Sequence, residues 1–319
     1  AVGYYFRSVG RNWDDYVQFH PDERFMTGYI GLQLDRGYLT FTDGDEETQR
    51  QHCMAEYPNS NGVGGYFDAR CSDNNPHNIG AGHYAYGTMP PFVAHWFAEF
   101  IESIRPNPNP DEPLRELYTS YDVFPLVWRT LSSIYDTLVI AICFGIGYLL
   151  RGRWTGVLAA WLYAGAVLPI QVSHYATADA MTSLWVALAL FSALRAQARG
   201  RWFDYALFGA AFGAALASRF NVFPLVSAIL VVTALRMLPA FERSLPNSER
   251  SRIIVQEFGG LVLAGFFTIL VFRIFNPYAF VGPGFFGLMP NTRWLDDLGQ
   301  ARFETSPASS SPPQWQWVG

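Results

Sequence analysis

From Thr137 to Phe272 the sequence alternates long apolar runs with short charged segments, and this alternation limits the folds open to the chain. Only 15% of the 319 residues are charged, against about 25% in an ordinary soluble domain. Several runs are shorter than the ~20 residues that cross a bilayer, but polar flanks extend most of them, and so many apolar runs leave too little amphipathic surface to cover a soluble core. We therefore predict an all-α membrane protein, a multi-pass helical bundle. The runs without Asp, Glu or Arg are 137–150, 154–178, 180–194, 205–218, 220–235 and 258–272.

The placement of arginine predicts which ends of these helices share a side of the membrane. All 22 basic residues are arginine, and those of the apolar half concentrate in every second connection. The positive-inside rule places the arginine-rich connections in the cytoplasm, so the other connections and the acidic N-terminal region face the extracytoplasmic side of the cell membrane. The cytoplasmic connections carry Arg151 and Arg153, then Arg195, Arg199 and Arg201, then Arg236, Arg243, Arg250 and Arg252.

Three regions follow from this topology. Residues 1–122 form a first extracytoplasmic loop, 123–276 a bundle of about six spans, and 277–319 a second extracytoplasmic loop. Within the first loop, a Pro-Pro pair opens an apolar stripe at helical spacing over 90–105, which predicts either a helix lying in the membrane interface or a core helix of a small outer domain. The first ten residues resemble the end of an apolar helix, so we expect the chain to be a segment of a longer protein.

Two further compositional features bound the function. Cys53 and Cys71 both lie in the predicted first loop, where an oxidising compartment would allow a disulfide, although two free thiols are an equal alternative. The net charge of −5 and the absence of a basic, aromatic-interleaved patch exclude nucleic acid as a partner.

Two acidic motifs fall on the predicted outer face. The first is "HPDER" at 20–24, with Asp22 and Glu23, and the second is "SHYATADAM", which contains His174 and Asp179. Their acids can converge on a cleft at the membrane surface, which suits a substrate with a lipid tail and a polar head. Each also has a structural interpretation: a helix start with first-turn acids in "HPDER", an acid in the first helical turn at Asp179, and an interfacial histidine at His174.

Charged residues within or beside the apolar runs form a second group of candidates. Arg129 and Asp136 are seven residues apart and share a helical face, where they either fix helices to one another or contact a donor phosphate. Arg219 and Arg273 lie at outer ends of runs. A guanidinium there can hold a lipid phosphate with paired donors, or it can extend (snorkel) to the membrane interface without binding a substrate.

These motifs, in this order, resemble a known family. "NWDD…HPDERF", "NNPHN…YAYGTMP", "WRTLSSIYDTL", "QVSHYATADAMTSLW" and "ASRFNVFPL" are similar to the bacterial lipid-carrier-dependent glycosyltransferases of the GT-C superfamily. The nearest branch is glycosyltransferase family 39, with protein O-mannosyltransferases and aminoarabinose transferases as relatives. The resemblance covers most of residues 10–280.

The resemblance implies an inverting transferase that moves a sugar from a polyprenyl-phosphate donor to a protein or lipid acceptor. Asp22 matches the catalytic acidic residue of the family's first outer loop and is expected to be the general base. Asp179 matches a second functional acidic residue, in the family's second outer loop. Glu23 is expected to orient Arg24 or a nearby backbone group. The expected substrate-binding residues are His20, Arg24, His174, Arg129, Arg219 and Arg273.

Some relatives use a divalent metal ion near these acids, but this sequence presents no closed ligand set, so no metal or other cofactor is assigned. The alternative function is a non-catalytic membrane subunit or transporter whose outer loop docks a partner. In that case Arg129 and Asp136 are gating or structural charges.

Overall fold

The chain forms two compact units in a computed structural model. The structure describes residues 1–31, 53, 55, 63–72, 74–84, 86–105, 118–242, 245–282, 284–304 and 306. We call Ala1–Leu32 with Met89–Phe275 the bundle unit, and Gln33–Thr88 with Asn276–Gly319 the second unit. The predicted boundaries at 122 and 276 separate segments on different sides of a membrane, and they stay a prediction. The second unit is a different division, because it combines the middle of the predicted first loop with the segment that follows α13.

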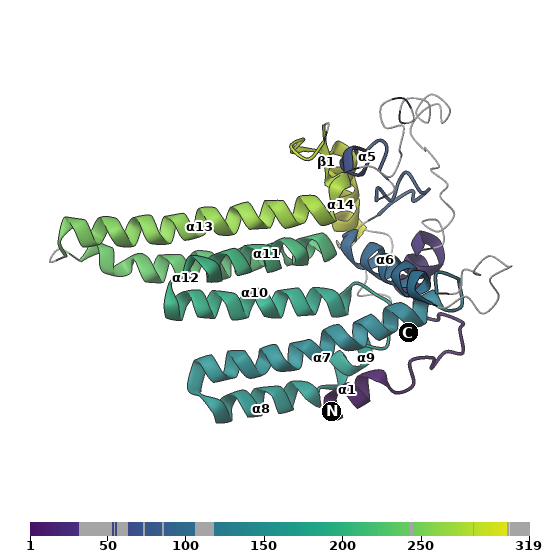
Figure 1. Ribbon diagram of the computed structural model, residues 1–319, viewed down its shortest axis with the longest axis horizontal. Coiled ribbons are helices and arrows are strands. Elements are labelled where there is room, and N and C mark those ends of the chain that lie inside the picture. The colour runs from purple at the N-terminus through teal and green to yellow at the C-terminus, as the bar shows by residue number, and fades with distance from the viewer. Residues whose placement is uncertain are drawn as a thin grey trace. The chain divides into compact units, whose positions relative to one another are not determined.

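The bundle unit is a layer of long apolar helices. Figure 1 shows α8, α7, α10, α11 and α13 side by side in this order. Among the residues just given as described, four segments are long and apolar enough to cross a membrane, namely α7, α10, Phe220–Phe241 and α13, which confirms the predicted all-α membrane class. The elements are α1 (Val2–Ser8), α2 (Pro21–Glu23), the π-helix η1 (Arg24–Gly31), α6 (Met89–Ile104), α7 (Phe124–Arg151), α8 (Arg153–Ala164), α9 (Val167–Val172), α10 (Asp179–Arg199), α11 (Trp202–Ser218), η2 (Phe220–Leu225), α12 (Val226–Met237), η3 (Leu238–Phe241) and α13 (Asn247–Phe275).

The apolar run 154–178 is not one helix. The helix α8 ends at Ala164, Gly165 is its C-cap, and a second short helix, α9, starts at Val167. The Arg7 guanidinium donates to the Tyr163 and Ala164 carbonyl oxygens at 3.1 and 3.0 Å. The last carbonyls of a helix have no partner within the helix, and Arg7 supplies donors to two of them at the end of α8.

Close backbone contact joins α11 to α13. A Cβ atom added at Gly209 would lie 2.1 Å from the Ala264 carbonyl oxygen, and one at Gly213 would lie 2.5 Å from the Thr268 carbonyl oxygen. The Thr268 hydroxyl also donates to the Gly209 carbonyl oxygen at 3.2 Å. Small residues let the two backbones approach, as is usual where helices associate in lipid.

Gly209→Ala is expected to destabilise the bundle, because the added methyl group meets backbone atoms that cannot rotate away. We expect a loss of about 1–3 kcal/mol, typical of overpacking, seen as a lower midpoint of thermal unfolding in detergent. The matched control is Gly265→Ala on α13, where the space around the added Cβ is open and alanine favours the helix. Equal midpoints for the two variants would contradict the close packing.

The helix predicted over 90–105 is present as α6. It turns its small residues Ala94 and Ala98 inward, while Trp96, Phe100 and Ile104 are 39%, 57% and 64% exposed. Most of the predicted apolar stripe therefore stays outside the protein core. This exposure is what an interfacial helix needs, and the interfacial position stays a prediction.

The second unit is small and cross-linked. A disulfide joins Cys53 and Cys71, so the structure shows the disulfide rather than two free thiols. Asp297 accepts from both His77 and His83, at 2.7 and 3.1 Å, and thereby ties the two parts of the unit together. The unit contains α5 (Val63–Phe67), η4 (Pro277–Ala279), the antiparallel pair β1 (Phe280–Val281) and β2 (Met289–Pro290), and α14 (Thr292–Glu304).

Candidate active site

Two distant aspartates meet at one arginine of the bundle unit. Nη2 of Arg219 lies 3.0 Å from Oδ2 of Asp179 and 3.9 Å from Oδ2 of Asp22. The side chains are partly open to solvent, with 38% of Asp22, 39% of Asp179 and 25% of Arg219 exposed. The structure therefore brings together the two acids that the sequence left 157 positions apart, at a place that a ligand can reach.

Local sequence explains how each acid is presented. His20 is the N-cap of α2, and its Nδ1 accepts from the Glu23 N–H at 3.4 Å, with Pro21 as the first helical residue. Asp179 is the first residue of α10, and Thr177 donates to its carboxylate at 3.0 Å. Both motifs are therefore helix starts, as their structural interpretation predicts, and acids there are stabilised by the helix dipole.

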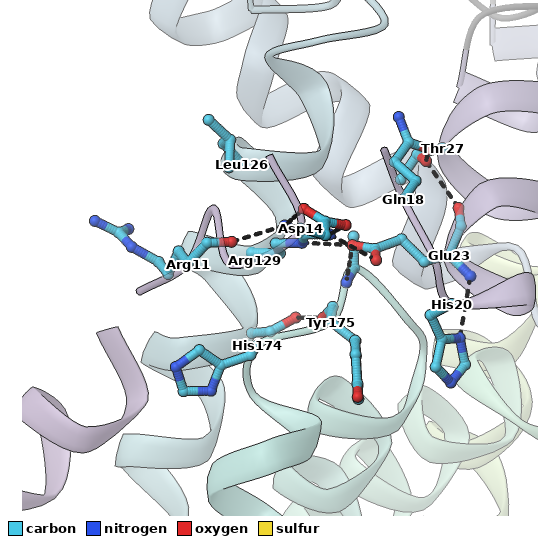
Figure 2. A network of polar contacts seen from close by, with 12 residues as sticks. Arg11, Asp14, Gln18, His20, Glu23, Thr27, Leu126, Arg129, His174 and Tyr175 are labelled. Atoms are coloured by element: carbon cyan, nitrogen blue, oxygen red, sulfur yellow. Dashed lines mark hydrogen bonds and ion pairs between the residues drawn. The ribbon is translucent and has the colours of Figure 1, made fainter. Parts of the chain in front are cut away.

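A buried ion cluster centred on Arg129 includes Glu23, the residue that follows Asp22 (Figure 2). The guanidinium donates twice to Glu23, at 2.6 and 2.8 Å, and twice to Asp14, at 2.8 and 2.6 Å. Nη1 also donates to the Arg11 carbonyl oxygen at 2.7 Å. These contacts use all five N–H donors of an arginine. In this structure every guanidinium donor of Arg129 therefore has a partner within the protein.

This cluster connects the segments that carry the two aspartates. Glu23 is completely buried and also accepts from the backbone N–H of Ala176 at 2.8 Å. Since Glu23 follows Asp22 and Ala176 precedes Asp179 by three residues, the pair sets the position of one acid relative to the other. Glu23 therefore orients Arg129 and the Ala176 backbone, whereas Arg24, its expected partner, donates to the Gln18 carbonyl oxygen at 3.3 Å.

The cluster also alters the protonation equilibrium of the Asp14 carboxyl group. Its carboxylate accepts hydrogen bonds from Arg129 and lies beside that positive charge, and together these outweigh burial and hold the pKa of Asp14 below its ordinary value. Asp14 is therefore an anion at neutral pH although its side chain has no exposed area. A buried carboxylate of this kind depends on its partner for stability.

A second buried cluster lies further along α7. Asp136 is paired with Arg7 and accepts from the Tyr163 hydroxyl at 2.5 Å. Arg129 and Asp136 share a face of α7, as their spacing predicts, but each has its own partners. Asp136 thus joins α1, α7 and α8, which is a fixing contact between helices.

The remaining expected substrate-binding residues lie in different surroundings. The ring of His20 packs on Tyr175, with centroids 4.6 Å apart, and both ring nitrogens of His174 face carbonyl oxygens, those of Ile170 and Val9, at 2.7 and 2.8 Å. Arg273 is fully buried near the end of α13. Arg219 is thus the one of these side chains that contacts both aspartates.

Asp14 and Arg7 are buried ion-pair positions that the sequence did not reveal. Asp14 belongs to the quoted motif "NWDD", but nothing in the sequence separates it from Asp15. The structure separates them, because Asp14 is buried and paired with Arg129 whereas Asp15 is exposed. Asp15, Tyr16 and Gln18 have φ values of 52°, 69° and 54°, which residues other than glycine seldom adopt.

Among the residues that the structure describes, no group of three or more His, Cys, Asp and Glu side chains could hold a metal ion. At the aspartate pair, Arg219 supplies positive charge at the position between the two carboxylates.

The fold, together with the contacts of Asp22 and Asp179 with Arg219, defines a multi-pass helical membrane protein with an acid–arginine site at the ends of its helices. Residues 125–272 match the family model described as dolichyl-phosphate-mannose-protein mannosyltransferase, just under half of the chain. Over these residues the chain is similar to GT-C type glycosyltransferases, which depend on lipid-phosphate sugars, and this supports the resemblance found in the sequence. It includes Arg129, Asp179 and Arg219. No curated protein and no solved structure matches the chain.

Proposed function

We propose that the protein transfers a sugar from a polyprenyl-phosphate donor to a hydroxyl or amine of a protein or lipid acceptor, with inversion at the anomeric carbon. The single observation that carries this proposal is the convergence of Asp22 and Asp179 on Arg219. A transferase of this kind needs a base for the acceptor and a cation for the departing phosphate, both open to substrate. These three side chains supply both.

In this mechanism Asp22 takes the proton from the attacking group of the acceptor. The new bond forms between that atom and the anomeric carbon while the bond from the anomeric carbon to the phosphate oxygen breaks. The lipid phosphate leaves with its negative charge, and Arg219 stabilises that charge with paired N–H donors. Asp179 holds the guanidinium in place, since its carboxylate lies nearer to Arg219 than that of Asp22 does.

We further propose that the site faces the extracytoplasmic side of the cell membrane. Asp179 and Arg219 lie at the helix ends opposite to the arginine-rich connections, at the start of α10 and the end of α11. The positive-inside rule puts those connections in the cytoplasm. The Cys53–Cys71 disulfide is in keeping with an oxidising compartment for the second unit.

The test is to incubate membranes that contain the full-length protein with a panel of labelled polyprenyl-phosphate sugars and to follow label into protein and lipid fractions. We expect transfer from at least one donor, absent from membranes without the protein. Uptake or release of a donor with no new glycosidic bond would instead identify a transporter. Binding of a partner without turnover of any donor would identify a non-catalytic subunit.

A further inference from the structure

An apolar hairpin follows the last long helix of the chain. β1 and β2 pair in register, Phe280 with Pro290 and Val281 with Met289. We call residues 280–290 the apolar hairpin. Phe286, Leu288 and Met289 of this hairpin are 87%, 46% and 71% exposed, although their side chains are large and apolar.

The hairpin is held in place by its own unit. Phe285 packs edge-on against Phe67, with ring centroids 5.2 Å apart, while the adjacent Phe286 is turned outward. At its base, Asn291 donates from its backbone N–H to Ala279 at 2.9 Å and from its side chain to the Tyr278 carbonyl oxygen at 2.8 Å. The exposed side chains therefore project from a hairpin that is fixed to its unit by these contacts.

The chain around the hairpin indicates what covers these side chains. α13 is a candidate membrane span that ends at Phe275, and no charged residue occurs from Ile274 to Thr292. A segment that emerges from a bilayer and carries aromatic and aliphatic side chains but no charge has the composition of an interfacial anchor. A surface that binds a soluble partner reversibly normally has a polar rim.

We propose that the apolar hairpin inserts Phe286, Leu288 and Met289 into the lipid interface at the membrane surface where α13 ends. The second unit is then anchored to the bilayer by side chains as well as by the chain that leaves α13. This assignment is independent of the sugar-transfer chemistry, because it requires only that α13 spans the membrane.

Site-directed spin labelling tests the proposal in full-length protein reconstituted into lipid nanodiscs. Cys143 is the one free cysteine among the described residues, so Phe286→Cys is made in a Cys143→Ala background and labelled without reductant to keep the disulfide. A nitroxide at 286 should collide several-fold more often with oxygen, which concentrates in lipid, than with a water-soluble nickel complex. The matched control is Asp296→Cys on the exposed side of α14 in the same unit, where nickel should dominate.

Two results would overturn the proposal. One is the same nickel accessibility at 286 as at 296, which places the hairpin in water. The other is protection of 286 from both reagents, which places it against protein, either an acceptor polypeptide or a second copy of the chain. Met289→Cys repeats the measurement at an independent position, so a poorly folded Phe286→Cys protein does not leave the question undecided.

Discussion

Asp22→Asn is expected to lower the rate of sugar transfer by about 10²–10⁴-fold, the usual cost of losing a general base. Asparagine keeps the shape of the side chain but cannot accept the proton of the acceptor. The folded protein should persist, because Asp22 is partly exposed and its ion pair with Arg219 is 3.9 Å long, and such pairs contribute at most about 1 kcal/mol. The measurement is the initial rate with the donor identified in the panel, at equal amounts of folded protein.

Asp122→Asn is the matched control for this experiment. Asp122 is an exposed carboxylate of the bundle unit just before α7, and it belongs to neither polar cluster. Its rate should equal that of the unmodified protein. An Asp22→Asn protein that transfers sugar at the normal rate would reject Asp22 as the base. Asp179 would then be the remaining carboxylate at Arg219.

Arg129→Met is expected to destabilise the bundle unit by about 3–5 kcal/mol, because it leaves the buried carboxylates of Asp14 and Glu23 without a cation. The loss should appear as a lower midpoint of thermal unfolding in detergent and as a smaller yield of folded protein. Arg24→Met is the matched control, because Arg24 is exposed and donates from Nε to the Gln18 carbonyl oxygen. A change within about 1 kcal/mol is expected there.

A triple variant separates lost charge balance from lost packing. Combining Arg129→Met with Asp14→Asn and Glu23→Gln removes the charges together, and replacing a whole buried ion cluster is often far less costly than breaking it. The triple variant should therefore be more stable than Arg129→Met alone. Equal or lower stability would show that shape and hydrogen bonds, rather than unpaired charge, account for the loss.

The two variants also distinguish two kinds of role. Asp22 is expected to affect the reaction with little effect on stability, since it is open to a ligand. Arg129 is expected to affect stability first, since every N–H of its guanidinium already donates within the protein. The sequence around Arg129 alone gives no sign of this difference.

The sequence by itself determined the class of fold and the motifs that matter. Apolar runs and arginine-rich connections are read one segment at a time, because burial in lipid and the positive-inside rule depend on local composition. The same holds for the helix starts at Pro21 and Asp179, where cap and first-turn chemistry are local. The expected helix over 90–105 is present within one residue at each end.

Only the tertiary structure decided which charges are partners. Arg129 lies 106 positions from Glu23 and 115 from Asp14, and Arg7 lies 129 positions from Asp136. Local composition assigns such residues equally to a substrate, a neighbouring helix or the interface. Pairing depends instead on which helix faces pack together and which donors are left after packing, and these follow from the whole fold, in which a buried charge must find its partner at any distance along the chain.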